Sequence, residues 1–132
     1  MTHSVFHIPI PVLGVIEAGF PSPAEEELSD TLTLDDWLMA NKEATIMLKA
    51  PNDAMGGAGI MAGDLVLLDR SRTPKDGDIV LGEVDRVSTL RCFRKQGSQV
   101  WLEAAHPQYK ALVPKEKLTV TAVVVAVIRK YY

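Results

Sequence analysis

Four segments of the sequence contain the small, proline-flanked or reactive residues from which a cleavable or catalytic site can be built. Taken singly, each has an ordinary structural interpretation: a proline-rich arm, a strand with turns, a plain strand and a last turn. In chain order they are Ile16–Ala24, Lys49–Met55 with the following Gly59–Leu65 and Asp76–Val80, Ser88–Phe93, and His106–Tyr109. The first contains Ala18-Gly19, a small peptide bond that an active site accepts easily. Cleavage of such a bond needs a hydroxyl nucleophile and a base that removes its proton.

In order and spacing, the four segments together resemble the LexA/UmuD family of self-cleaving serine–lysine proteases, from about Val15 to Arg129. In that family an Ala-Gly or Cys-Gly bond before Phe-Pro-Ser-Pro is cut, a Gly-Asp-Ser-Met turn carries the nucleophilic serine, and a Thr-Val-Lys strand carries the lysine base. The resemblance implies that Ala18 and Gly19 form the cleavage-site-like bond. It also implies that Ala54 and Arg91 stand at the positions of the nucleophile and the base.

Both of these positions depart from the chemistry of the family. Ala54 has no nucleophilic atom. Arg91 cannot act as a base, because a guanidinium has a pKa above about 12 and stays protonated, whereas a buried lysine can reach its neutral form. Each change alone is therefore sufficient to stop cleavage. The sequence predicts no functional catalytic residue, only these two degenerate positions.

No neighbouring residue is predicted to replace the missing pair. Thr89 matches a family threonine on the same face of the strand as Arg91, and its simplest role is that of a hydrogen-bonded strand residue, as for Ser88. Strand alternation points Cys92 to the opposite face, as a buried and inert thiol. The three histidines lie in no motif that places them near Ala54: His3, His7 and His106.

Two origins of the missing pair remain open. An engineered knockout of an active peptidase is one, because serine to alanine is the standard change that traps an uncut protease. Natural loss is favoured by the neighbouring residues: Pro51-Asn52 stands where the family has Ser-Gly, so the whole turn has drifted. In addition, Asp85-Arg86 occupies a tight hairpin at which Asp-Gly is usual.

Length and composition limit the classes of function. The chain has 132 residues, 47% apolar and 23% charged, which suits one globular domain. A single cysteine excludes an internal disulfide and a metal site built on thiolates, and no metal or cofactor is expected. The net charge of −3 and scattered basic residues argue against direct DNA binding. Without a targeting segment or an apolar run of about 20 residues, the chain is expected to be cytoplasmic, not a membrane protein.

The elements that position these residues are mostly strands. Residues 1–30 are predicted to form an extended arm broken by prolines, and residues 31–132 a β-rich domain. A short helix follows Thr33 as N-cap and ends near Asn41. Strands are predicted at Ala44–Lys49, Asp64–Asp69, Asp78–Val84, Val87–Phe93, Gln99–Glu103 and Leu118–Arg129. The predicted fold is the LexA/UmuD-type protease domain of rolled mixed sheets with one short helix.

The resemblance also implies a biological setting. Only Met1–Ala18 precede the cleavage-site-like bond, too few for the DNA-binding domain of LexA repressors, so the UmuD branch is expected. That branch serves error-prone DNA synthesis in the SOS response, forms homodimers, and meets a Y-family DNA polymerase and the RecA filament. The leading hypothesis is a non-cleaving UmuD-like protein that works by binding. The alternatives are a catalytically dead mutant of an active protease, a substrate cut in trans at Ala18-Gly19, a heterodimer partner that regulates an active relative, and a protease with another nucleophile.

Overall fold

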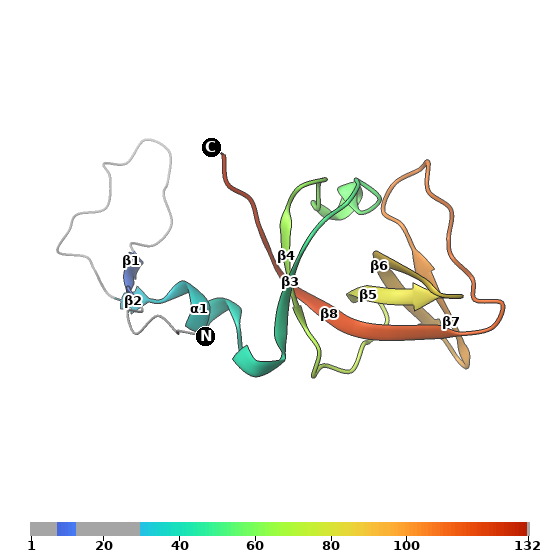
Figure 1. Cartoon of the computed structure of the whole chain (residues 1–132), viewed down its shortest axis with the longest axis horizontal. Helices are drawn as coiled ribbons and strands as arrows, with labels where there is room; N and C mark the ends of the chain where they lie inside the picture. Colours follow the sequence, from blue (N-terminus) through green and yellow to red (C-terminus); the bar gives the residue numbers. More distant parts are fainter. Residues whose placement is uncertain (1–7, 13–29, 132) are drawn as a thin grey trace. The chain divides into compact units, whose positions relative to one another are not determined.

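The structure is a computed structural model and describes residues 8–12 and 30–131. The chain divides into two compact units, Met1–Ala40 and Asn41–Tyr132 (Figure 1). The cleavage-site-like Ala18 and Gly19, as well as His3 and His7, lie outside the described residues, so the predicted arm 1–30 and its boundary at residue 30 stay predictions.

The first unit contains a two-stranded antiparallel ribbon and the predicted helix. Strand β1 (Ile10–Val12) pairs with β2 (Asp30–Leu32), and Pro11 is accommodated there because a two-stranded ribbon has free edges. Helix α1 (Leu34–Leu38) begins after Thr33, which is extended as expected of an N-cap, although its side chain makes no capping hydrogen bond. The helix ends at Leu38 with Met39 as C-cap, so the expected end near Asn41 was wrong.

The second unit is built on one six-stranded sheet in the order β3-β4-β8-β5-β6-β7. Its strands are β3 (Thr45–Lys49), β4 (Leu65–Asp69), β5 (Ile79–Val84), β6 (Val87–Gln96), β7 (Gln99–Glu103) and β8 (Leu118–Ile128). Two 3-10 turns precede β3 and β4 respectively, η2 (Lys42–Ala44) and η3 (Gly56–Ala58). The mostly β fold class and the strand assignments are confirmed.

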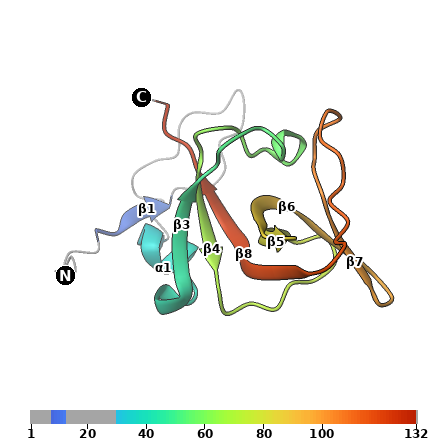
Figure 2. The same cartoon turned by 45° about the vertical axis from the view of Figure 1, so that its right-hand side comes forward.

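The sheet is not mixed, contrary to the prediction. Every described strand pairing is antiparallel. Short hairpin turns join β5 to β6 and β6 to β7, and such turns permit only antiparallel neighbours. The long strand β8 then returns between β4 and β5 and runs antiparallel to both (Figure 2).

The rolled shape of this sheet comes from the irregular pairing of β8. Its C-terminal half pairs with β4 and its N-terminal half with β5, and a register shift interrupts each pairing, at Leu67/Leu68 and at Leu81/Gly82. Such shifts bend a strand and increase its twist. Two hydrophobic clusters result, one containing Val66 and Leu68, the other Val80 and Leu102. The side chains of all four residues are fully buried.

The turn between β5 and β6 is the predicted hairpin at Asp85-Arg86. Both residues have positive φ, 48° for Asp85 and 75° for Arg86, as a two-residue type I′ turn requires. The Asp85 carboxylate also accepts the backbone N–H groups of Lys115, Glu116 and Lys117 at 3.0–3.2 Å. It thereby fixes the end of the long connection between β7 and β8. Within the described part of the chain, no helix is long and apolar enough to cross a bilayer.

Candidate functional site

The turn that carries Ala54 connects β3 to β4 and is closed at its base. Ala50 donates its N–H to the Asp64 carbonyl at 2.8 Å, and Gly63 donates to the Ala50 carbonyl at 2.8 Å. Within the turn, the Ala54 N–H donates to Asn52 Oδ1 at 3.0 Å, and Ala54 is only 1% exposed. Asn52 therefore stabilises the turn by the local side-chain bond that makes asparagine common in turns. Pro51 and Asn52, which differ from the family pattern, therefore still belong to a turn closed by hydrogen bonds.

A second segment, after β7, is bonded to this turn. Ala105 donates its N–H to the Ala54 carbonyl at 2.8 Å, and Gly57 donates its N–H to the Ala105 carbonyl at 2.7 Å. A Cβ at Gly57 would lie 2.7 Å from the Ala105 carbonyl oxygen, so only glycine allows this approach. These bonds bring together the β3–β4 and β7–β8 connections, which meet at one end of the second unit (Figure 1).

Arg91 projects from β6 and is 8% exposed. Its Nη1 donates to Thr89 Oγ1 in a short hydrogen bond and to the Leu90 carbonyl at 2.8 Å. The guanidinium carbon lies 5.4 Å from the centre of the Tyr109 ring, a cation–π distance. Burial lowers the pKa of Arg91, but a guanidinium remains protonated in proteins. The predicted hydrogen-bonding role of Thr89 on the face of Arg91 is confirmed.

Tyr109 connects Arg91 to the Ala54 turn. Its hydroxyl donates to Asp53 Oδ1 at 3.2 Å, and Asp53 directly precedes Ala54. Burial, together with the Asp53 carboxylate, raises the pKa of Tyr109. The tyrosine therefore contacts both Arg91 and Asp53, the residue before Ala54. Its sequence signal was the His-Pro-Gln-Tyr turn, and Asp53 lies within the Lys49–Met55 segment, although no role was assigned to it.

His106 also belongs to this cluster, which corrects the expectation that no histidine lies near Ala54. Its Nε2 is 3.4 Å from Asp53 Oδ2, and its ring makes an edge contact with Tyr109 at 5.1 Å between centroids. The Gln108 N–H donates to His106 Nδ1 at 3.1 Å. In the neutral ring, Nδ1 is thus the acceptor and Nε2 carries the proton. The described contacts of His106 are with Gln108, Asp53 and Tyr109.

The sequence matches the family described as Peptidase S24-like over residues 11–125. The chain belongs to this family. The LexA/UmuD resemblance is therefore confirmed at the level of the S24-like family.

Individual S24-like relatives include LexA repressors from three bacteria. The chain is 33% identical to the LexA repressor of Acidothermus cellulolyticus, an alignment that covers 93% of this chain and 44% of the repressor. It is 35% identical to that of Verrucomicrobium spinosum, covering 94% and 62%, and 38% identical to that of Mycobacterium tuberculosis, covering 92% and 50%. The chain spans about half the length of these relatives. They are LexA repressors, so the UmuD branch stays a prediction.

Two other reactive side chains of this S24-like domain, Ser88 and Cys92, lie on β6. Cys92 is half-buried, its Sγ lies 3.9 Å from the Phe93 carbonyl oxygen, and burial raises the pKa of its thiol, which disfavours the reactive thiolate. Ser88 is exposed on β6, and no basic side chain among the described residues is hydrogen-bonded to it. No group of three acidic, histidine or cysteine residues in the described part could hold a metal ion.

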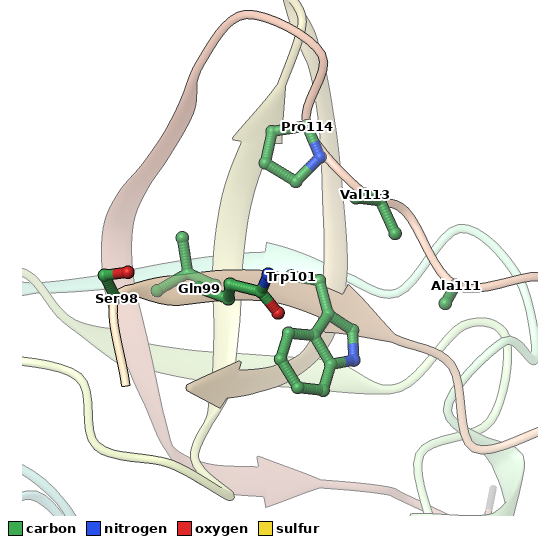
Figure 3. Close-up of a pocket in the computed structure, with 7 residues that line it drawn as sticks. Ser98, Gln99, Trp101, Ala111, Val113 and Pro114 are labelled. Atoms are coloured by element: carbon green, nitrogen blue, oxygen red, sulfur yellow. The ribbon is translucent and has the colours of Figure 1, made fainter. Parts of the chain in front are cut away.

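A pocket of about 580 Å³ lies apart from this cluster, beside the edge strand β7. Figure 3 shows Trp101 on one side of it and Val113 and Pro114 on the other. Its walls are uncharged and are formed by Ser98, Gln99, Val100, Trp101, Ala111, Val113 and Pro114. None of these residues was singled out by the sequence, and none belongs to the cluster around Ala54.

Proposed function

We propose that this chain is a non-cleaving member of the S24-like family that acts by binding other proteins in the SOS response to DNA damage. The observation that carries the proposal is the burial and hydrogen bonding of the Arg91 side chain. Its guanidinium is buried, bonded to Thr89 and the Leu90 carbonyl, and stacked on Tyr109, so it is a fixed cation where the family places a base.

The position of Ala54 supports the same conclusion. Its methyl group is 1% exposed, in a turn held by Asn52 and Ala105. A serine hydroxyl is absent there, and neither Asp53 nor His106 supplies a nucleophile. Acyl transfer needs a nucleophile and a base in one hydrogen-bonded arrangement. Tyr109 and Asp53 instead fill this part of the domain with a hydrogen-bonded cluster.

The partners follow from the family resemblance. A UmuD-like protein would act in the cytoplasm as a homodimer, with a Y-family DNA polymerase and the RecA filament as partners. A heterodimer with an active relative would make the chain a regulator of cleavage. Because the relatives named above are LexA repressors that extend well beyond the matched region, a role close to theirs is the competing assignment.

Incubation of the purified chain with an activated RecA filament tests the absence of cleavage. Intact mass spectrometry should find only the full-length chain after prolonged incubation. A LexA repressor treated in parallel provides the positive control for the filament. Detection of a fragment that begins at Gly19 would refute the proposal, because such a fragment requires a nucleophile and a base in this chain.

A second candidate function is that of a substrate cut in trans. The retained Ile16–Ala24 segment, with its Ala18-Gly19 bond, favours it. An active relative mixed with this chain should then produce the fragment that begins at Gly19, whereas the chain alone should not. An intact bond after complete self-cleavage of the relative would exclude the substrate role and leave the binding role.

A further inference from the structure

One edge of the Arg91 guanidinium, formed by Nε and Nη2, has no hydrogen-bond partner among the described residues. Its Nη1 is bonded to Thr89 Oγ1 and to the Leu90 carbonyl. Its Nε is buried and has no hydrogen-bond partner among the described residues, and Nη2 makes no hydrogen bond in the same part of the chain. In arginine, Nε and Nη2 form the edge of the planar fork that matches both oxygens of a carboxylate.

The charge of Arg91 is unbalanced as well. Three other arginines of the domain have carboxylate partners: Arg72 lies 3.5 Å from Asp69, Arg94 lies 3.0 Å from Asp76 and 3.0 Å from Glu103, and Arg129 lies 2.6 Å from Asp64. Among the described residues Arg91 forms no such ion pair, although it is 8% exposed. A buried charge without a counter-ion is costly, so a ligand that supplies one gains binding energy from it.

The nearest acidic group of the cluster is already engaged. Asp53 accepts the Tyr109 hydroxyl at Oδ1 and lies 3.4 Å from His106 Nε2 through Oδ2. Tyr109 therefore separates Asp53 from Arg91 and stacks on the guanidinium instead. Since the Tyr109 ring lies over the guanidinium and Nη1 is already bonded, the Nε–Nη2 edge is the part of Arg91 left to bind a ligand.

We infer that the Nε–Nη2 edge of Arg91 binds a carboxylate carried by a peptide. This inference rests on the proposed function, since it gives the uncut site a binding role. A carboxylate accepts from Nε and Nη2 together, whereas the neutral carbonyl of an amide lacks the charge that balances the guanidinium.

Two kinds of carboxylate could supply this chemistry, a peptide C-terminus or a Glu side chain. The chain's own Gly14–Ala18 segment contains both when it is made as a peptide that ends at Ala18, because Glu17 precedes the terminal carboxylate. Four N-acetylated peptides separate the two sources: the free acid, the C-terminal amide, and each of these with Glu17→Gln.

Binding of the four peptides to the full-length chain is measured by NMR titration, with the Arg91 Nε–H resonance as the reporter. Peptides that keep the recognised carboxylate should bind about tenfold tighter than the matched peptide without it. They should also move the Nε–H resonance downfield. Tight binding of the free acid with Glu17→Gln identifies the C-terminus as the source, and tight binding of the Glu17-containing amide identifies the side chain.

Two variants test whether the effect belongs to Arg91. In Arg91→Gln the preference for the carboxylate should vanish. In Arg94→Gln, which removes an equal charge from an ion-paired residue on the same strand, the preference should persist. Equal affinity of all four peptides for the unaltered chain, or no movement of the Arg91 resonance at saturating or millimolar peptide, overturns the inference. Self-cleavage is scored separately by mass spectrometry, so failure of the proposed function is a different result.

Discussion

At the scale of single residues, the proposed non-cleaving site lacks a hydroxyl at Ala54 and has a permanent positive charge at Arg91. Ala54 keeps the buried backbone position of the turn without a hydroxyl, and Arg91 keeps a long cationic side chain without an accessible neutral form. These two defects are chemically independent, because one concerns the nucleophile and the other its activation. Under the proposed assignment, restoring cleavage therefore requires both positions to change.

Restoring the pair stepwise gives the first prediction. Ala54→Ser and Arg91→Lys should each remain uncut, because the first lacks a base and the second lacks a nucleophile. Only the double variant is expected to produce a fragment that begins at Gly19, measured by intact mass spectrometry over days. The double variant with an additional Gly19→Pro change serves as the control for the site of cleavage. Cutting by either single variant would contradict the assignment of Ala54 and Arg91 as the degenerate pair.

Asp64 is the residue whose titration most directly affects stability. Arg129 donates to it through Nε at 2.7 Å and Nη2 at 2.6 Å, and Met61 donates its N–H at 2.8 Å. These bonds lower the pKa of Asp64 from 3.8 to about 2. Since the folded-state pKa is depressed, the stabilisation is complete above pH 3.8 and is lost as the pH falls through about 2.

Replacement of this carboxylate gives the second prediction. Asp64→Asn should lower the free energy of unfolding at pH 7, measured by urea denaturation. The difference from the unaltered chain should shrink steadily between pH 4 and pH 2, where the native carboxylate also becomes protonated. Glu103→Gln, at a half-exposed ion pair with Arg94, should change stability less than Asp64→Asn and serves as the control. A difference that stays constant with pH would show that the ion pair is not its cause.

At the scale of elements, the β5–β6 hairpin combines a correct turn geometry with an unfavourable residue. Arg86 has φ 75°, and its side chain is exposed. A non-glycine residue in the left-handed region costs about 1–2 kcal/mol, which the greater unfolded-state entropy of glycine offsets in part. Asp85 tolerates this region better and is also needed to hold the loop at Lys115–Lys117.

The third prediction follows from this turn. Arg86→Gly should raise the free energy of unfolding by about 0.5–1 kcal/mol, because the left-handed strain is removed. Arg86→Ala removes the same exposed side chain but keeps a Cβ at positive φ, so no comparable gain is expected. Urea denaturation of both variants at pH 7 measures the difference. Equal stability of the two variants would locate the strain elsewhere in the hairpin.

Local elements were largely predictable, whereas contacts between elements were not. The alternation along residues 87–93 correctly placed Thr89 on the face of Arg91, and the Asp85-Arg86 pair correctly located a hairpin. The contact of His106 with Asp53 joins residues from two distant connections, and no periodicity encodes such a contact. The antiparallel sheet was missed because strand composition does not specify the direction of a neighbour.

At the scale of the whole molecule, the hydrophobic core belongs to one of the two units. The buried members of both clusters lie between Ala50 and Val123, within Asn41–Tyr132. The matched family region begins earlier, at residue 11, so it also includes part of the first unit. The sheet and its core define the second unit as the part that should fold without the first.

A fragment of residues 41–132 is therefore expected to unfold cooperatively, with a thermal midpoint within about 5 °C of the full chain. The reason is that β3–β8 and both core clusters are complete within it. Calorimetry and the dispersion of amide resonances measure the result. Leu68→Ala in the same fragment should lower the free energy of unfolding by about 2–5 kcal/mol, because Leu68 is 0% exposed, and this confirms that the transition reports the core. A broad, non-cooperative transition would mean that residues 1–40 supply part of the stability of the sheet.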